Sequence, residues 1–236
     1  MREKMQSKLY TEQEPAADHE LHLTVSESPG RMTIVVPFPS GYPETPFRKV
    51  ARHIARLWLT WSMEAPGVML HGLYVHTHPS TIQGASATPE ERQATRGLGK
   101  RMLCLAIRTL TTEQKLSLET PLRLEACGGK CDENKTSAVL RCTSERELDA
   151  FLQNFPASLA EFEGRVGRKA TLEEKAEMKC GYDKRHALVN YYRQYGFIEE
   201  PLGPDGEDTL FCTPMITTLG TALRACDTEL PRVRRR

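Results

Sequence analysis

The chain has 236 residues, 39% of them hydrophobic, which is enough apolar material to bury a core as one domain or one domain with an insertion. Its formal net charge of +1 excludes the strong overall field typical of proteins that bind nucleic acid or anionic membranes. No apolar run could span a bilayer, and residues 1–6 lack the apolar segment of a secretory signal. The seven cysteines are therefore expected to be reduced thiols in a cytoplasmic or nuclear protein.

The N-terminal part predicts an arm, a hairpin and a helix. Residues 1–19 are polar and mixed in charge, which favours a flexible arm. Residues 21–36 hold two runs that alternate apolar and polar side chains around a Pro-Gly turn, which predicts a β-hairpin. After a proline-rich crossing, residues 47–61 carry apolar side chains at helical spacing, which predicts a helix with Thr45 as its N-cap.

The C-terminal part alternates strands with helical segments. It predicts a central strand at 68–76, a polar loop at 77–95 and a second strand at 122–126. A mostly helical insertion at 130–183 follows, and then a helix at 186–195 that ends at Gly196. Two short strands at 197–199 and 210–215 and a tail at 221–236 complete the chain. Residues 20–220 are therefore expected to form a single domain that contains the insertion.

A basic, glycine-rich turn at residues 94–101 leads into a helix whose apolar side chains share one face, namely Leu98, Met102, Leu103, Ala106, Ile107 and Leu110. Gly97 and Gly99 let a ligand approach the backbone, and the unpaired N–H groups of a first helical turn attract anions. The turn is thus a candidate site for phosphate or diphosphate. It does not fit the Walker A or dinucleotide-binding patterns, because Arg101 and Met102 stand at required positions, and an ordinary glycine turn is the alternative.

The sequence predicts no metal site. His76 and His78 are two residues apart but have no third ligand at a fixed spacing, so surface histidines are the simpler interpretation. Cys127, Cys131 and Cys142 lack the paired spacing of a zinc site.

The order strand, glycine-basic turn, helix, strand and helix-Gly-Phe resembles that of the GNAT superfamily of N-acetyltransferases. Residues 73–75 resemble the end of that family's fourth strand, residues 96–100 its pyrophosphate turn, and residues 192–197 its Tyr-x-x-x-Gly-Phe signature. The resemblance covers about residues 67–127 and 184–215. It implies an α+β, three-layer fold with a mixed, mostly antiparallel twisted sheet flanked by helices, plus the helical insertion.

The resemblance also implies direct transfer of acetyl from acetyl-CoA to a primary amine, of a small molecule or a protein, in a ternary complex. It implies acetyl-CoA contacts from Leu73, Tyr74, Val75, Arg96, Gly97, Leu98, Gly99, Lys100 and Arg101. The run from His71 to His76 is similar to one in arylalkylamine N-acetyltransferases, which makes His71 a candidate base, with a buried core histidine as the alternative. Tyr192 is the candidate acid for the leaving thiolate, with simple packing as the alternative.

Other features depart from the family pattern. Ala94 stands where the family has Gln or Arg, and the N-terminal half matches poorly, so a coenzyme-A-binding sensor or scaffold without catalysis is a second hypothesis. Residues 42–46 resemble the Tyr-Pro turn of RWD-like domains, so a protein-interaction domain is the third hypothesis. Neither nucleic acid nor membrane is an expected partner, and the expected state is a monomer or homodimer.

Overall fold

The computed structural model describes residues 5–11, 20–27, 30–38, 53–62, 67–75, 95, 97–128, 131, 133–200 and 210–227, the first two of these ranges by their backbone alone. The chain divides into two compact units. The first comprises Met1–Leu124, Tyr195–Phe197 and Ile216–Arg236, and the second comprises Glu125–Gln194 and Ile198–Met215.

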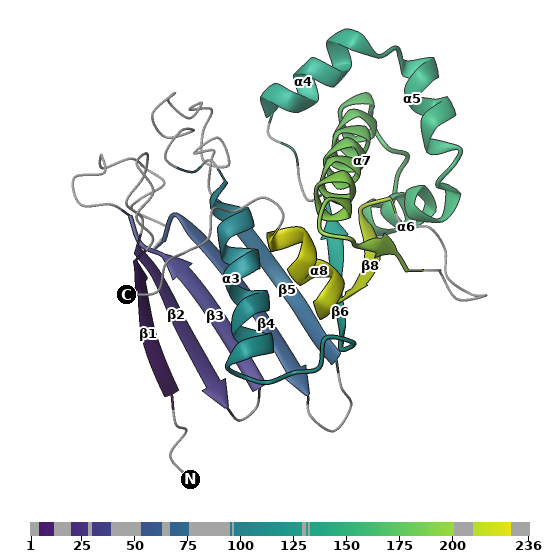
Figure 1. Ribbon diagram of the computed structural model, residues 1–236. Coiled ribbons are helices and arrows are strands. Elements are labelled where there is room, and N and C mark those ends of the chain that lie inside the picture. The colour runs from purple at the N-terminus through teal and green to yellow at the C-terminus, as the bar shows by residue number, and fades with distance from the viewer. Residues whose placement is uncertain are drawn as a thin grey trace. The chain divides into compact units, whose positions relative to one another are not determined.

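The described strands are β1 Met5–Thr11, β2 Glu20–Glu27, β3 Gly30–Val36, β4 Ala55–Ser62, β5 Gly67–Val75, β6 Pro121–Cys127, β7 Ile198–Glu199 and β8 Cys212–Thr218. Their order in the sheet is β1-β2-β3-β4-β5-β6-β8-β7 (Figure 1). Neighbours from β1 to β5 are antiparallel, whereas β5 and β6 are parallel and are joined through the helix α3, Leu98–Thr112. The expectation of an α+β fold with a mixed, mostly antiparallel sheet and accompanying helices is therefore confirmed.

The predicted hairpin is confirmed, since β2 and β3 pair in antiparallel register. The predicted helix at 47–61 is wrong for its last part, because residues 55–62 form β4. Apolar residues in this stretch fit helical spacing, but they also alternate, and β4 buries every second side chain from Ala55 to Trp61. Pairing with β3 on one side and β5 on the other decides between the two periods. Thr45 and the RWD-like turn lie outside the described residues.

Both predicted ends of the chain contain regular structure. Residues 5–11 form β1 within the predicted arm, and helix α8, Leu219–Asp227, enters the predicted tail. Among the described residues, no helix combines the length and the apolar character needed to cross a bilayer.

Helix α3 runs across the face of β3, β4 and β5 (Figure 1). The whole predicted apolar stripe of α3 is buried, and so are the side chains of Met32, Ile34, Leu57 and Leu59 on the sheet. Each such large side chain contributes about 1.5–3 kcal/mol when it leaves water. Helix α8 packs beside α3, where a disulfide joins Cys104 to Cys226. This core fixes where α3 begins relative to β5.

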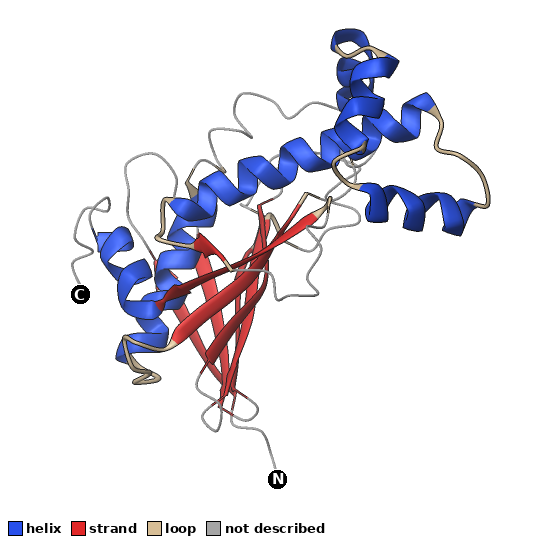
Figure 2. Ribbon diagram, turned by 90° about the vertical axis from the view of Figure 1, so that its right-hand side faces the viewer, coloured by secondary structure: helices blue, strands red, loops and turns tan. Residues whose placement is uncertain are grey.

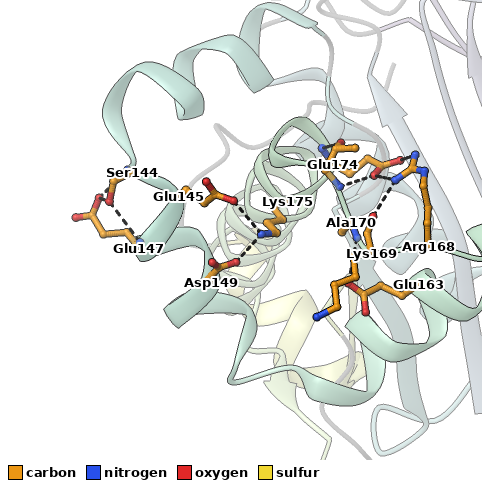
Figure 3. Close-up of polar contacts among 11 residues, drawn as sticks. Ser144, Glu145, Glu147, Asp149, Glu163, Arg168, Lys169, Ala170, Glu174 and Lys175 are labelled. Atoms are coloured by element: carbon orange, nitrogen blue, oxygen red, sulfur yellow. Dashed lines mark hydrogen bonds and ion pairs between the residues drawn. The ribbon is translucent and has the colours of Figure 1, made fainter.

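The described part of the second unit contains four helices, α4 Glu133–Cys142, α5 Glu145–Leu152, α6 Pro156–Val166 and α7 Leu172–Arg193, and α7 is one continuous helix (Figure 2). The predicted helix at 186–195 is thus the end of a longer one. Thr171 caps the start of α7, and the Glu174 carboxylate accepts hydrogen bonds at 2.7 Å from both guanidinium nitrogens of Arg168 (Figure 3). The Arg168 hydrogen bond and the backbone hydrogen bond from Thr171 lower the pKa of Glu174 to about 2.

Disulfides contradict the prediction of reduced thiols. Cys104 pairs with Cys226 in the first unit, and Cys127 with Cys212 and Cys131 with Cys180 in the second. Cys142 is the exposed free cysteine. The pairs are 49 to 122 residues apart in the chain, so no local spacing in the sequence could have identified them.

Candidate functional site

The predicted glycine turn begins α3. Gly97 is the N-cap residue, with φ 72° and ψ −2°, a left-handed conformation that favours glycine. The helix has no side-chain cap and no acidic residue in its first turn, so within its described residues no side chain compensates the N-terminal end of its dipole. Within the turn the Leu98 N–H donates to the Thr95 carbonyl at 3.2 Å. Arg96, predicted to belong to this site, lies outside the described residues.

Arg101 distinguishes this helix end from an ordinary glycine turn. Its side chain lies in the first turns of α3, and the residue is only 8% exposed. The Arg101 Nε is buried and has no hydrogen-bond partner among the described residues. A buried guanidinium keeps its charge, and it is costly to bury unless an anion or another acceptor meets its donors. The arrangement therefore suits an anion held at the start of α3.

The other residues predicted to contact acetyl-CoA differ in whether their side chains are exposed. Leu98 is fully buried in the core, so only its backbone could meet a ligand, whereas Gly99 and Lys100 are partly exposed. On β5, Leu73 pairs with Leu57 and so lies on the face that α3 covers. Val75 pairs with Ala55 and lies on that face as well, whereas the Tyr74 side chain is on the opposite face and 53% exposed.

The parallel ladder between β5 and β6 is short. Its three residue pairs run from Val68 with Leu122 to Leu70 with Leu124, while β5 continues to Val75. Residues 71–75 thus lie beyond the described pairs of this ladder, and the edge of a strand beyond its ladder can offer its backbone groups to an extended ligand.

His71 sits at a β-bulge. Trp58 pairs with Gly72 but Leu59 pairs with Leu70, which leaves His71 as the extra residue of β5. Sequence alternation predicts that His71 shares a face with Leu73 and Val75, and this is wrong because the bulge shifts the alternation. The exposed His71 side chain instead lies beside Thr60 of β4, with 2.8 Å between Thr60 Oγ1 and His71 Nε2. The alternative of a buried core histidine is therefore excluded.

We call the side of the sheet that carries His71 the arginine face. Its described side chains are Arg31, Thr33 and Val35 of β3, Arg56, Trp58 and Thr60 of β4, Met69, His71 and Tyr74 of β5, and Arg123 of β6. On β3 to β6 the sequence contains one carboxylate, Glu125, which alternation along β6 places on the same face as Arg123. The face thus carries three arginines and, at its β6 end, one exposed glutamate. Sequence reasoning missed this face because it took β4 for a helix.

Two aromatic rings occupy the centre of the arginine face. Trp58 and Tyr74 stack with their centroids 5.1 Å apart and their planes 19° apart. The Arg56 guanidinium lies 5.1 Å from the Trp58 ring centroid. Gly72 makes room for the indole, since a Cβ built there would lie 2.3 Å from Trp58 Cη2. A hollow of about 270 Å³ lies where β4 ends and β5 begins, and it is lined in part by Thr60, Met69 and Arg123.

Tyr192 lies in the second unit, on α7, where it is buried and meets Tyr191 edge-on with 5.3 Å between ring centroids. Its burial agrees with either a packing role or an acid kept out of water. The strand that precedes Gly128 brings Glu125, Cys127 and Cys212 together, but the two cysteines are bonded to each other and so offer no thiolate to a metal. His76 and His78 lie outside the described residues.

No protein-family model, curated protein or solved structure matches this chain. The function has to be argued from the residues themselves.

Proposed function

We propose that this protein is a GNAT-type N-acetyltransferase that moves the acetyl group of acetyl-CoA to a primary amine by direct attack in a ternary complex. The observation that carries the proposal is Arg101, a buried residue in the first turns of α3 whose Nε has no hydrogen-bond partner among the described residues. Together with the left-handed Gly97 and the uncapped helix end, it suits the diphosphate of coenzyme A.

Further support comes from the elements on either side of this turn. The resemblance requires a strand before the turn and a parallel strand after the helix, and β5 and β6 have this relation. Past Leu70, the backbone of β5 lies beyond the described ladder with β6, so it could hold the extended arm of coenzyme A by amide hydrogen bonds. Leu73, Tyr74 and Val75 are the residues assigned to this contact.

In the proposed reaction, the amine nitrogen attacks the thioester carbonyl carbon, the C–S bond breaks, and the amine loses a proton as the thiolate gains one. His71 is exposed and keeps an imidazole nitrogen within hydrogen-bond distance of Thr60, which orients its ring. The imidazole in its neutral form can take the proton, directly or through a water molecule. Tyr192 is assigned the return of a proton to the thiolate.

The experiment is a pair of measurements on the full chain. Calorimetry measures the binding of coenzyme A, and thiol release from acetyl-CoA is followed with a panel of primary amines. Binding together with amine-dependent thiol release is expected. Binding without turnover on any amine would replace the transferase by the coenzyme-A-binding sensor, and absence of binding would refute both.

Tyr192→Phe tests the assigned acid. Removing one general acid costs about 10²–10⁴-fold in rate, so turnover should fall by at least about a hundredfold while the affinity for acetyl-CoA stays unchanged. Tyr191→Phe, on the preceding residue of the same helix, is the matched control and should keep the wild-type rate. An unchanged rate of Tyr192→Phe across pH would remove this tyrosine from the mechanism.

A further inference from the structure

The arginine face has a composition that the proposed function does not require. It carries Arg31, Arg56 and Arg123 against one carboxylate on β3 to β6, Glu125, and it belongs to a chain whose net charge is only +1. A protonated amine such as a polyamine is repelled by such a face, whereas an anionic group is attracted to it. Among the amine acceptors that the sequence left open, this face therefore favours one that carries an anionic group over a polyamine.

Arg56 is the arginine nearest the aromatic rings. Its guanidinium is 5.1 Å from the Trp58 ring centroid, and its buried Nε has no hydrogen-bond partner among the described residues. An anion bound beside the rings would lie next to this guanidinium and be attracted by its charge. Tyr74, 53% exposed and stacked on Trp58, offers ring surface to a planar ligand at the same place.

The strand register orders these groups along the sheet. Arg56 pairs with Tyr74, Trp58 pairs with Gly72, and Thr60, which contacts His71, follows two residues later on β4. Because a strand rises about 3.3 Å per residue, Arg56 and Thr60 are about 13 Å apart along the strand, with the rings between them. A ligand could therefore place an anion at Arg56, a ring at Tyr74 and an amine at His71.

We propose that the arginine face binds a planar ring with an anionic group, carboxylate or phosphate, at one end and a primary amine at the other. This inference rests on the proposed function in one respect, because it takes the amine at His71 to be the acceptor. The binding of the ring and the anion does not depend on acetyl-CoA.

Calorimetry on the full chain without acetyl-CoA tests the binding. The probes are 4-(aminomethyl)benzoate, its analogue benzylamine without the carboxylate, O-phosphotyramine, tyramine without the phosphate, and spermine. One charge-assisted hydrogen bond changes an affinity by about tenfold or more, so each anionic probe should bind at least about tenfold more tightly than its neutral-tailed partner. Preference for one anionic probe over the other identifies carboxylate or phosphate as the anion.

Two variants and one control locate the site. Arg56→Gln should remove the advantage of the anionic probes, and Tyr74→Ala, a change at an exposed side chain, should weaken all ring-containing probes by about tenfold. Arg146→Gln, on the exposed surface of α5, should change nothing. A melting curve for each variant tests whether it is folded. If Arg56→Gln does not fold, Tyr74→Ala alone tests the location of the site.

Equal affinities within each probe pair, or tight binding of spermine, would overturn the inference. It would also fail if Arg56→Gln and Tyr74→Ala both bound the probes like wild type. The proposed function fails separately. If coenzyme A does not bind but the anionic probes still depend on Arg56, the ring-and-anion site stands without the transferase. If benzylamine and spermine are acetylated at the same rate as 4-(aminomethyl)benzoate, the protein is a transferase without this substrate specificity.

Discussion

Gly72→Ala is the sharpest single change on the arginine face. The new Cβ would lie 2.3 Å from Trp58 Cη2 and 2.6 Å from Cζ3, whereas ordinary contact begins at 3.4 Å, so the indole must move by roughly 1 Å or more. Moving it weakens the stack on Tyr74, worth about 0.5–1.5 kcal/mol, and the Arg56 contact, worth about 0.5–1 kcal/mol. Replacing a strand glycine returns about 0.5–1 kcal/mol. The net expectation is a loss of about 1 kcal/mol.

A double-mutant cycle separates this clash from other effects of alanine. The free energy of unfolding is measured in urea by tryptophan fluorescence, with Trp61 as the probe that remains when Trp58 is replaced by alanine. In the Trp58→Ala background the added Cβ no longer meets an indole, so Gly72→Ala should be neutral or stabilising. The coupling between the two changes should be about 1.5–2 kcal/mol. The same destabilisation in both backgrounds would refute the packing described for this face.

Three further outcomes are expected. Arg101→Met should stabilise the protein without ligand, by about 1 kcal/mol or more in urea unfolding, because it removes a buried Nε that has no hydrogen-bond partner among the described residues; a destabilised variant would mean that the guanidinium already has one. The start of α7 should loosen in acid: the pKa of Glu174 is lowered from 4.5 to about 2, so its stabilisation is fully present above about pH 4.5 and is lost as the pH falls through 2. Hydrogen exchange of the α7 amides between pH 5 and 2 checks this, and Glu174→Gln should abolish the dependence. Iodoacetamide without reductant should label Cys142 alone, and labelling of further cysteines in the oxidised, unfolded chain would contradict the disulfides.

Local patterns predicted the elements whose partners are close in sequence or whose period is unambiguous. The hairpin of β2 and β3 needs only a short turn between two alternating runs, and the apolar stripe of α3 repeats at helical spacing over four turns. The same reasoning gave the wrong element for residues 55–62, because their two tryptophans and neighbouring leucines fit both the helical and the strand period. Only the strands on either side, one of them paired across a bulge, decide that this stretch is β4.

The candidate site was predictable to a similar degree. Gly97 and the start of α3 follow from glycine chemistry and the helical stripe. The orientation of His71 does not, because a one-residue bulge reverses which face a side chain takes. Gly72 signals that a bulge can occur in β5, but it does not fix which residue is the extra one. The burial of Arg101 could not be predicted either, since a basic residue in a polar turn is usually exposed.

The central claim is that Arg101 and the start of α3 hold the diphosphate of coenzyme A. Calorimetry with coenzyme A and with pantetheine, which lacks the diphosphate, on wild type and Arg101→Met tests it most directly. We expect Arg101→Met to weaken coenzyme A by at least about tenfold and to leave the weak binding of pantetheine unchanged. Coenzyme A that binds Arg101→Met as tightly as wild type, or no more tightly than pantetheine does, would contradict the account.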